Sequence, residues 1–313
     1  MKLPTLLETR LKEIYTPEEM AMVDEAFSLE KRKVSFRINT LKSSAQEVES
    51  ALLKKKISFS KQDFLPNCYI LETGVERDLW NLDIYKEWYI YIQSIASQMP
   101  VEFLELTEWM TVLDVTAAPG GKTSQISERV WEDGKVVACE LSTIRREKMT
   151  YNLQKLWCTN VEIVGWEAQK LSETYTQGSF DAMLFDAPCS SEGSISYNDE
   201  TFLTDWSMRH IDKNYQRQKD ILKQTVWLLK NGWVLVYSTC TLAPEENESI
   251  VHYILCNFKE LEIQEIHSDF PYTKPWILKF WKYVFTKNVA LSMRIVPNPI
   301  SEWFFIAKFR KKS

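Results

Sequence analysis

Short apolar segments alternate with longer polar stretches through the second part of this chain. Each apolar segment has the length of a strand and is followed by polar or helix-forming sequence, which is typical of parallel strands buried on both faces. These segments lie at residues 111–115, 135–140, 161–164, 180–186 and 232–237. Strands that alternate with helices predict a doubly wound α/β sheet.

The amino-terminal part has a different order of elements. Helical sequence is followed by a predicted strand, a helix and a second strand, at residues 33–40, 44–56 and 68–71. This mixed order indicates a small α+β unit. We therefore expect an amino-terminal domain over residues 1–92 and a second domain over residues 93–313, with residues 90–106 largely helical.

Two segments near the carboxyl terminus complete the expected sheet. Residues 291–295 and 303–309 are predicted to be strands that pair as a hairpin and close the sheet edge. Before them, Pro244 and the acids that follow it mark the start of a helix that ends near Asn257. Proline suits the first turn of a helix, and acids suit the positive end of the helix dipole.

The composition narrows the class of protein. Of the 313 residues, 45% are hydrophobic and 26% are charged, as in soluble globular proteins. No apolar stretch has the length of a bilayer and none follows residues 1–5, so we expect a cytoplasmic protein with no membrane partner. The six cysteines form no C-x-x-C pair and no zinc spacing, which predicts free thiols and no metal. We expect a monomer.

The net charge of −5 gives no general signature of nucleic-acid binding. Cations nevertheless cluster, and such runs are usually solvated faces. The clusters lie at residues 31–33, 54–56, 145–146 and 310–312.

A glycine-containing turn, residues 118–123, joins the first apolar strand to the next helix. Glycine lets the backbone approach a ligand, and the start of a helix presents free N–H groups. The turn matches neither G-x-G-x-x-G nor a Walker pattern, and by itself it could be only a tight connection. Three acids at the ends of the following strands, Glu140, Glu167 and Asp186, favour an adenosine-bearing cofactor, because a carboxylate there can accept hydrogen bonds from a ribose diol.

Several motifs together resemble the RNA cytosine-C5 methyltransferases of the Sun or Fmu family. The resemblance spans nearly the whole chain, and the pair of motifs that each contain a cysteine is its most specific part. The matching segments are residues 36–41, 117–123, 186–190, 237–241, 244–248, 294–297 and 304–307.

This resemblance implies a Rossmann-like, seven-stranded S-adenosylmethionine-dependent methyltransferase sheet with a small α+β amino-terminal domain. It implies that Cys240 is the nucleophile, that Cys189 assists product release, and that Lys122 and Asp186 face the catalytic centre. Glu167 stands where the family more often has Asp. The residues implied to surround S-adenosylmethionine are Thr116, Ala117, Ala118, Pro119, Gly120, Gly121, Lys122, Glu140, Glu167 and Asp186.

The chemistry explains why such groups are needed. Cytosine C5 is a poor nucleophile, but addition of a thiolate at C6, with a proton or hydrogen bond at N3, makes C5 enamine-like. Asp186 is the expected partner of N3, provided that it is protonated at the right moment. DNA cytosine methyltransferases use the cysteine of a Pro-Cys motif, whereas the RNA family with both motifs uses the Thr-Cys one, so we expect Cys240 to attack. Most free cysteines are inert and buried, and we expect this of Cys139, Cys158 and Cys256.

The target base has to leave any stack, so single-stranded or loop RNA, ribosomal or transfer, is the expected partner. The candidate contacts are residues 31–33, Arg37 and residues 191–206. Two alternatives stay open: a non-catalytic RNA-binding or ribosome-assembly factor on the same fold, and a small-molecule methyltransferase, which would need neither cysteine.

Tryptophan is unusually common and glycine unusually rare, with 12 and 8 residues. Several tryptophans stand where the family pattern or local geometry favours glycine, and we expect that the source organism reads UGA as glycine. Trp80 and Trp206 look like genuine tryptophans. The expected set is Trp88, Trp109, Trp157, Trp166, Trp233 and Trp303, with Trp131, Trp227, Trp276 and Trp281 as further candidates.

Overall fold

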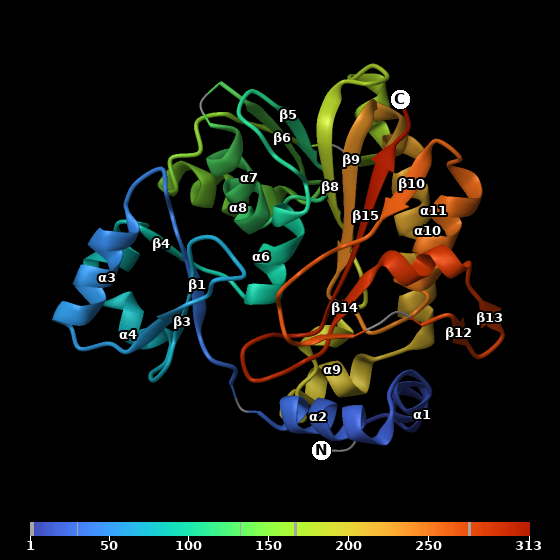
Figure 1. Ribbon diagram of the computed structural model, residues 1–313, viewed down its shortest axis with the longest axis horizontal. Coiled ribbons are helices and arrows are strands. Elements are labelled where there is room, and N and C mark those ends of the chain that lie inside the picture. Colours follow the sequence, from blue (N-terminus) through green and yellow to red (C-terminus); the bar gives the residue numbers. More distant parts are fainter. Residues whose placement is uncertain (1–2, 30, 132, 166–167, 275–276) are drawn as a thin grey trace.

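A large sheet organises the chain in the computed structural model, which describes residues 3–29, 31–131, 133–165, 168–274 and 277–313. Its order is β11-β14-β15-β9-β8-β5-β6-β7, with β10 also paired to β15 (Figure 1). The five parallel strands coincide closely with the predicted apolar segments. They are β5 (Thr111–Asp114), β6 (Lys135–Cys139), β7 (Val161–Val164), β8 (Phe180–Asp186) and β9 (Leu229–Thr239).

The carboxyl-terminal hairpin is present, as the sequence predicts. Strand β14 (Met293–Ile295) pairs antiparallel with β15 (Phe304–Lys311), and β15 pairs antiparallel with β9. The sheet extends beyond this hairpin through β10 (Leu261–Gln264) and β11 (Thr273–Lys274). The predicted Rossmann-like α/β class is confirmed, and the two short strands β10 and β11 add to the seven that were expected.

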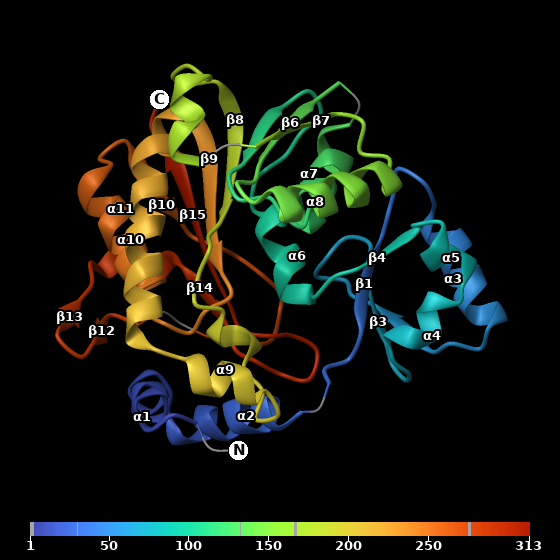
Figure 2. The ribbon, with the colours of Figure 1, turned by 180° about the vertical axis from the view of Figure 1, so that it is seen from behind.

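Helices cover both faces of this sheet (Figures 1 and 2). Successive residues of a strand point to opposite faces, so Val112 packs in one core cluster and Leu113 in another. One face is covered by α6 (Ile95–Glu102), α7 (Gly121–Val130) and α8 (Thr143–Lys155), and the other by α10 (Met208–Thr225) and α11 (Glu248–Asn257). Short 3-10 helices lie at Ala168–Glu173, Glu192–Ser194, Val226–Leu228 and Lys287–Leu291.

A four-stranded antiparallel sheet, ordered β2-β3-β1-β4, forms the small lobe on the left of Figure 1. It has its own core, which includes Phe36, Val48 and Leu71. Its elements are β1 (Ser35–Ile38), α3 (Ala45–Lys54), β2 (Phe59–Lys61), β3 (Cys68–Leu71), α4 (Glu76–Trp80), α5 (Asp83–Lys86) and β4 (Ile90–Ile92).

The prediction that residues 90–106 are largely helical is wrong at their start. Ile90–Ile92 pairs with β1 as strand β4, because its alternating apolar side chains complete the small sheet. The helix begins only after Ser94, whose hydroxyl accepts a hydrogen bond from the Ser97 N–H as an N-cap.

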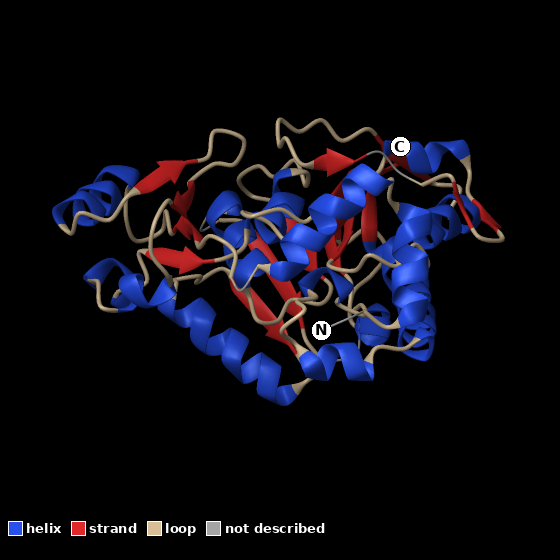
Figure 3. Ribbon diagram, turned by 90° about the horizontal axis from the view of Figure 1, so that it is seen from below, coloured by secondary structure: helices blue, strands red, loops and turns tan. Residues whose placement is uncertain are grey.

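The first two helices belong to the large core. Leu7 of α1 (Thr5–Ile14) and Phe27 of α2 (Pro17–Ser28) lie in the same cluster as β8 and β9. Arg10 forms a buried ion pair with Glu245 at 2.6 Å. In Figures 1 and 2 these helices lie beside α9 (Glu200–Asp205), at the bottom of the view, and Figure 3 shows the molecule from that end. The end of β4 coincides with the proposed boundary at residue 92, which stays a prediction. No helix in the described ranges is long and apolar enough to cross a membrane.

Five tryptophans have positive φ angles: Trp88 at 60°, Trp109 at 74°, Trp131 at 55°, Trp157 at 63° and Trp281 at 49°. By contrast, Trp303 is fully buried, and its indole N–H donates to the Thr241 carbonyl at 2.6 Å. Trp233 lies within strand β9. Trp166 and Trp276 lie outside the described residues.

Candidate active site

The candidate site lies where the order of the large sheet reverses, between β5 and its neighbour β8. Ligands of open α/β sheets bind at such a point, beyond the carboxyl ends of the strands. The glycine turn leaves β5 here and runs into α7, with Gly120 at a φ of 98°. A Cβ atom on Gly121 would stand 3.1 Å from Tyr91 Cε1, so the backbone approaches the small lobe closely at this residue.

One cavity gathers most of the predicted cofactor residues. Its wall also includes four residues of the β4–α6 segment, which the sequence analysis missed because it treated that segment as a helix. The lining residues are Asp114, Thr116, Ala117, Ala118, Pro119, Gly121, Lys122 and Asp186, together with Tyr91, Ile92, Gln93 and Ser97.

Asp114 is a further acid in this cavity that the sequence analysis did not identify. Its Oδ2 accepts a hydrogen bond from Thr123 Oγ1 at 2.7 Å, whereas its Oδ1 is buried without a partner among the described residues. Burial raises the pKa of Asp114 to about 7. The position of Asp114 at the end of an apolar strand was the only feature of the sequence that could have marked it as a site residue. An orphaned carboxylate oxygen beside a glycine cradle fits a ligand that carries hydrogen-bond donors or positive charge.

Lys122 and Asp186 form an ion pair inside the cavity. Lys122 Nζ donates to Asp186 Oδ2 and to Ser97 Oγ, both at 2.7 Å. The second carboxylate oxygen, Oδ1, accepts from Ser238 Oγ at 2.8 Å. Burial acts to lower the pKa of Lys122, but the Asp186 carboxylate outweighs it and the pKa is raised. The pair therefore offers a fixed donor next to a fixed acceptor.

The two cysteines of the paired motifs meet at the ends of β8 and β9. Their Sγ atoms are 3.5 Å apart. The hydrogen bond to Cys240, together with burial, raises the pKa of Cys189 well above its ordinary range. The same hydrogen bond lowers the pKa of Cys240 against the effect of burial, and the positive charge of Lys122 also lowers it. These opposite directions favour a proton on Cys189 and a thiolate on Cys240.

A buried polar network holds the loop that follows Cys189. The Glu246 carboxylate accepts hydrogen bonds from the Ser190 N–H at 3.0 Å and from Gln218 Nε2 at 3.2 Å. Burial raises the pKa of Glu246 to about 8. Gly193 donates its N–H to the Cys240 carbonyl at 2.8 Å, and a Cβ atom there would lie only 2.7 Å from that oxygen. Glycine is thus required for the two cysteine loops to meet.

Other predicted site residues have mixed outcomes. Glu140 is buried at the end of β6, where it accepts from the Ser142 N–H at 2.8 Å and lies 3.3 Å from Arg145, but it does not line the cavity. Glu167 lies outside the described residues.

Cys139 and Cys158 are buried, as expected, whereas Cys256 is exposed, so the prediction that it is buried is wrong. Among the described residues no group of three or more His, Cys, Asp or Glu is placed to hold a metal ion.

Arg37 does not contact solvent as an RNA ligand would, and that prediction is wrong. Its guanidinium is 2% exposed and bonds to Glu128, to Ser124 Oγ and, at 3.0 Å, to Gln93 Oε1. Arg37 joins the small lobe to α7 through Glu128. The sequence does not reveal this role, because the two residues lie 91 positions apart in the chain.

Comparison with known proteins identifies the family. The family described as 16S rRNA methyltransferase RsmB/F matches residues 101–310. The chain belongs to the RsmB/F methyltransferase family. This membership confirms the resemblance seen in the sequence and makes S-adenosylmethionine the expected methyl donor.

Several relatives carry the name ribosomal RNA small subunit methyltransferase F. The protein from Aeromonas salmonicida is 32% identical over 291 residues, which is 88% of this chain and 57% of the relative. That from Vibrio vulnificus is 31% identical over 98% of this chain and 64% of the relative. The chain thus spans about three fifths of the length of these relatives.

Solved structures share the fold of this RsmB/F family member. A methyltransferase homologue from Pyrococcus horikoshii is 29% identical and has a TM-score of 0.84, covering 98% of this chain and 95% of that chain. NSun6 from the same organism, solved with SFG, is 22% identical and has a TM-score of 0.83, covering 99% of this chain and 98% of that chain. The second likeness shows the fold alone.

Proposed function

We propose that this chain transfers a methyl group from S-adenosylmethionine to C5 of a cytosine in RNA, through a covalent bond between Cys240 and C6. Family membership supports methyl transfer, and the names of the relatives direct attention to small-subunit ribosomal RNA. The observation that carries the cytosine chemistry is the contact between the two sulfurs, 3.5 Å apart, with opposite pKa shifts.

Cys240 is suited to attack because a thiolate, and not a thiol, is the nucleophile. Lys122 stabilises that thiolate and also holds Asp186 in place. For Asp186 to donate a proton to cytosine N3, its carboxyl group must first receive one. Lys122 Nζ donates a hydrogen bond to it at 2.7 Å but holds its own proton tightly, because its pKa is raised, so the proton that Asp186 passes to N3 is taken up from solvent. Protonation at N3 makes C6 more electrophilic, so attack by sulfur becomes easier.

Release requires a base for the C5 proton. The hydrogen bond to Cys240 is the largest cause of the raised pKa of Cys189. Once Cys240 is bonded to carbon its sulfur carries no charge, and this cause disappears. The pKa of Cys189 then falls towards the value that burial sets, and once Cys189 has released its own proton to solvent its thiolate can take the C5 proton, whose bonding electrons expel Cys240. The order of the two roles therefore follows from one hydrogen bond.

S-adenosylmethionine supplies an electrophilic methyl group when it is bound. The residues that would hold it are those of the glycine turn, 116–122, with Asp186, Asp114 and Glu140. The orphaned Oδ1 of Asp114 and the close approach at Gly121 fit such a ligand. Glu167 stays a predicted contact.

We also propose that residues 1–92 help to bind the RNA. The test of the whole function is bisulfite mapping of 5-methylcytosine in small-subunit ribosomal RNA, prepared from cells with and without the active protein. We expect at least one cytosine to lose its methyl group without the protein, and a methylation pattern independent of the protein would refute the proposal.

A further inference from the structure

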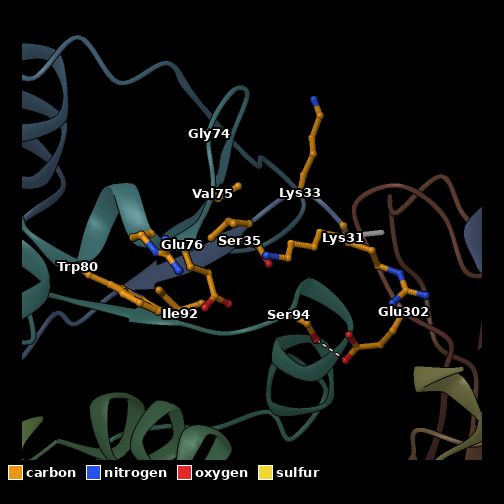
Figure 4. A pocket seen from close by; sticks show the side chains of 13 residues that line it. Lys31, Lys33, Ser35, Gly74, Val75, Glu76, Trp80, Ile92, Ser94 and Glu302 are labelled. Carbon is orange, nitrogen blue, oxygen red and sulfur yellow. Dashed lines mark hydrogen bonds between the residues drawn. The ribbon is translucent and has the colours of Figure 1, made fainter. Parts of the chain in front are cut away.

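A groove of about 760 Å³ runs between the small lobe and the large domain, and nothing in the proposed catalytic chemistry uses it. Its volume lies within the range of small-ligand pockets, about 300–1,000 Å³. One wall comes from residues 31–35, another from residues 74–77 with Trp80, and the floor from Ile92, Ser94 and Glu302 (Figure 4). Among the described residues its four cations, at positions 31, 32, 33 and 77, exceed its two acids, Glu76 and Glu302, although Lys33 is paired with Glu72 at 2.6 Å.

Two of the three guanidinium nitrogens of Arg32 at this groove, Nε and Nη2, are buried and have no hydrogen-bond partner among the described residues. Burial lowers the pKa of the group, and the nearby Glu302 carboxylate opposes that shift. Leaving such donors buried and unpaired is unfavourable, so they point to a ligand that accepts hydrogen bonds. Arginine is also the side chain best matched to a phosphate, because its planar fork donates two parallel hydrogen bonds. The anionic partner expected here is therefore a phosphate group.

Trp80 supplies an aromatic surface in the same groove. Its side chain is 44% exposed, which is unusual for a large ring, and it lies at the end of α4. The Arg77 guanidinium carbon lies 5.9 Å from the ring centroid and steadies one side of it. An exposed ring beside cations is the arrangement with which proteins bind single-stranded nucleic acid, by stacking of bases.

The groove adjoins the cofactor cavity described above. Ile92 lines both, and Ser94 begins the helix whose Ser97 accepts the hydrogen bond from Lys122. In the floor of the groove, Glu302 accepts a hydrogen bond from Ser94 Oγ at 2.5 Å. A strand of RNA whose cytosine lay at Cys240, beside Lys122 of this cavity, would therefore place a neighbouring nucleotide towards the groove.

We propose that this groove binds the nucleotide next to the target cytosine, with its phosphate at Arg32 and its base stacked on Trp80. The assignment rests on the proposed function, since it requires an RNA substrate. It names a place where a flanking base influences which cytosine is chosen.

The test measures the affinity of a short fluorescein-labelled oligocytidylate RNA by fluorescence anisotropy across a series of salt concentrations. Arg32→Ala should weaken binding roughly tenfold to a hundredfold and make the log–log salt slope shallower by about 0.7. Trp80→Ala should weaken binding by a similar factor, about five- to a hundredfold, without changing the slope, and Trp80→Phe should restore most of the loss. Lys223→Ala, at a half-exposed lysine of α10 outside both the groove and residues 1–92, is the matched control and should behave as the wild type.

Stacking is read separately by placing 2-aminopurine at each position of the oligonucleotide in turn. Its fluorescence should be quenched at one position by the wild type and by Trp80→Phe, but not by Trp80→Ala. Melting temperatures and calorimetric S-adenosylmethionine affinity should be unchanged in every variant. If the wild type binds and methylates RNA while Arg32→Ala and Trp80→Ala bind equally well, the groove assignment is overturned and the proposed function stands. If the wild type neither binds nor methylates RNA, the proposed function itself fails.

Five tryptophans occupy backbone positions that favour glycine, and this observation is independent of the groove. A residue with a Cβ atom is disfavoured in the left-handed region, where glycine is not. Trp131 and Trp157 stand at the ends of α7 and α8, where helices commonly finish with a left-handed glycine. Trp281 begins the two-residue turn between β12 (Lys279–Phe280) and β13 (Tyr283–Val284), where a positive φ also favours glycine.

We infer that the natural protein carries glycine at these five positions, because its organism reads the UGA codon as glycine. Trp109 and Trp131 are 68% and 61% exposed. They therefore bury little apolar surface that could offset the strain of a positive φ. Trp206 differs, because its φ is −58° and its indole N–H donates to Glu192 at 2.6 Å.

The gene and the recombinant protein test this inference independently. UGA codons are expected at positions 88, 109, 131, 157 and 281, with UGG at 80 and 206, and UGG at all seven would overturn it. In protein made from the printed sequence, Trp109→Gly and Trp131→Gly should each raise the melting temperature by roughly 2–4 °C. Trp206→Gly is the matched control and should lower it. Lower melting temperatures for the first two variants would also contradict the inference.

Discussion

Replacing Asp114 by asparagine should remove a pH-dependent loss of stability. The carboxyl group is buried beside the candidate cofactor cavity, with one oxygen bonded to Thr123 and the other unpaired. Burial raises its pKa from the ordinary value of 3.8 to about 7. An asparagine has nearly the same shape and can still accept from Thr123, but it carries no charge at any pH.

The size of the effect follows from the shift. The folded state holds the proton more tightly, so the stabilisation is fully present below about pH 4 and is lost as the pH rises through about 7. A shift of about three units corresponds to about 4 kcal/mol in the free energy of unfolding, of which about 3 kcal/mol falls between pH 5 and pH 8. Asp114→Asn should avoid this loss. Glu246 also has a raised pKa. Its contribution to the pH dependence of stability is the same in the wild type and the variant, so it cancels when the two are subtracted.

Urea unfolding of the wild type and of Asp114→Asn at pH 5 and pH 8 measures this difference. The free energy of unfolding of the variant, minus that of the wild type, should be about 3 kcal/mol larger at pH 8 than at pH 5. Asp220→Asn, at an exposed carboxylate of α10, is the matched control. Its free energy of unfolding should differ from that of the wild type by the same amount at pH 5 and at pH 8. A difference between Asp114→Asn and the wild type that does not change with pH would refute the reasoning.

Two further predictions concern the cofactor cavity and the link to the small lobe. Gly121→Val, through collision with Tyr91, and Glu140→Ala, through a lost hydrogen bond, should each weaken S-adenosylmethionine binding, the second by about ten- to a hundredfold. Unchanged calorimetric affinity in both would remove the cofactor from this cavity. Arg37→Ala should lower the free energy of unfolding by about 3–5 kcal/mol, since it leaves Glu128 buried without its partner, and a loss below 1 kcal/mol in urea unfolding would contradict this.

The parallel strands could be predicted because their signal is local. Each of the segments 111–115 and 180–186 is a short apolar run with a polar residue after it, and the structure places strands there with nearly the same bounds. The carboxyl-terminal hairpin was visible for the same reason. The meeting of Cys189 with Cys240 followed from a general rule about the ends of parallel strands, together with the family resemblance.

Other features depend on contacts between distant parts of the chain. Strand β4 was missed because Ile90–Ile92 takes its conformation from pairing with β1, and its apolar residues also suit a helix. Arg37 looks like a surface cation in the sequence, but Glu128 is its buried partner. The docking of α1 and α2 on the large core depends on pairs such as Arg10 and Glu245, which no local pattern connects.

The covalent adduct with RNA tests the central claim most directly. The purified wild type, Cys240→Ala and Cys189→Ala proteins are each incubated with small-subunit ribosomal RNA and S-adenosylmethionine, and separated under denaturing conditions. The account predicts that Cys189→Ala accumulates a protein–RNA adduct, and that Cys240→Ala forms neither adduct nor 5-methylcytosine. An adduct that accumulates in Cys240→Ala and is absent from Cys189→Ala would show that the roles of the two sulfurs are reversed.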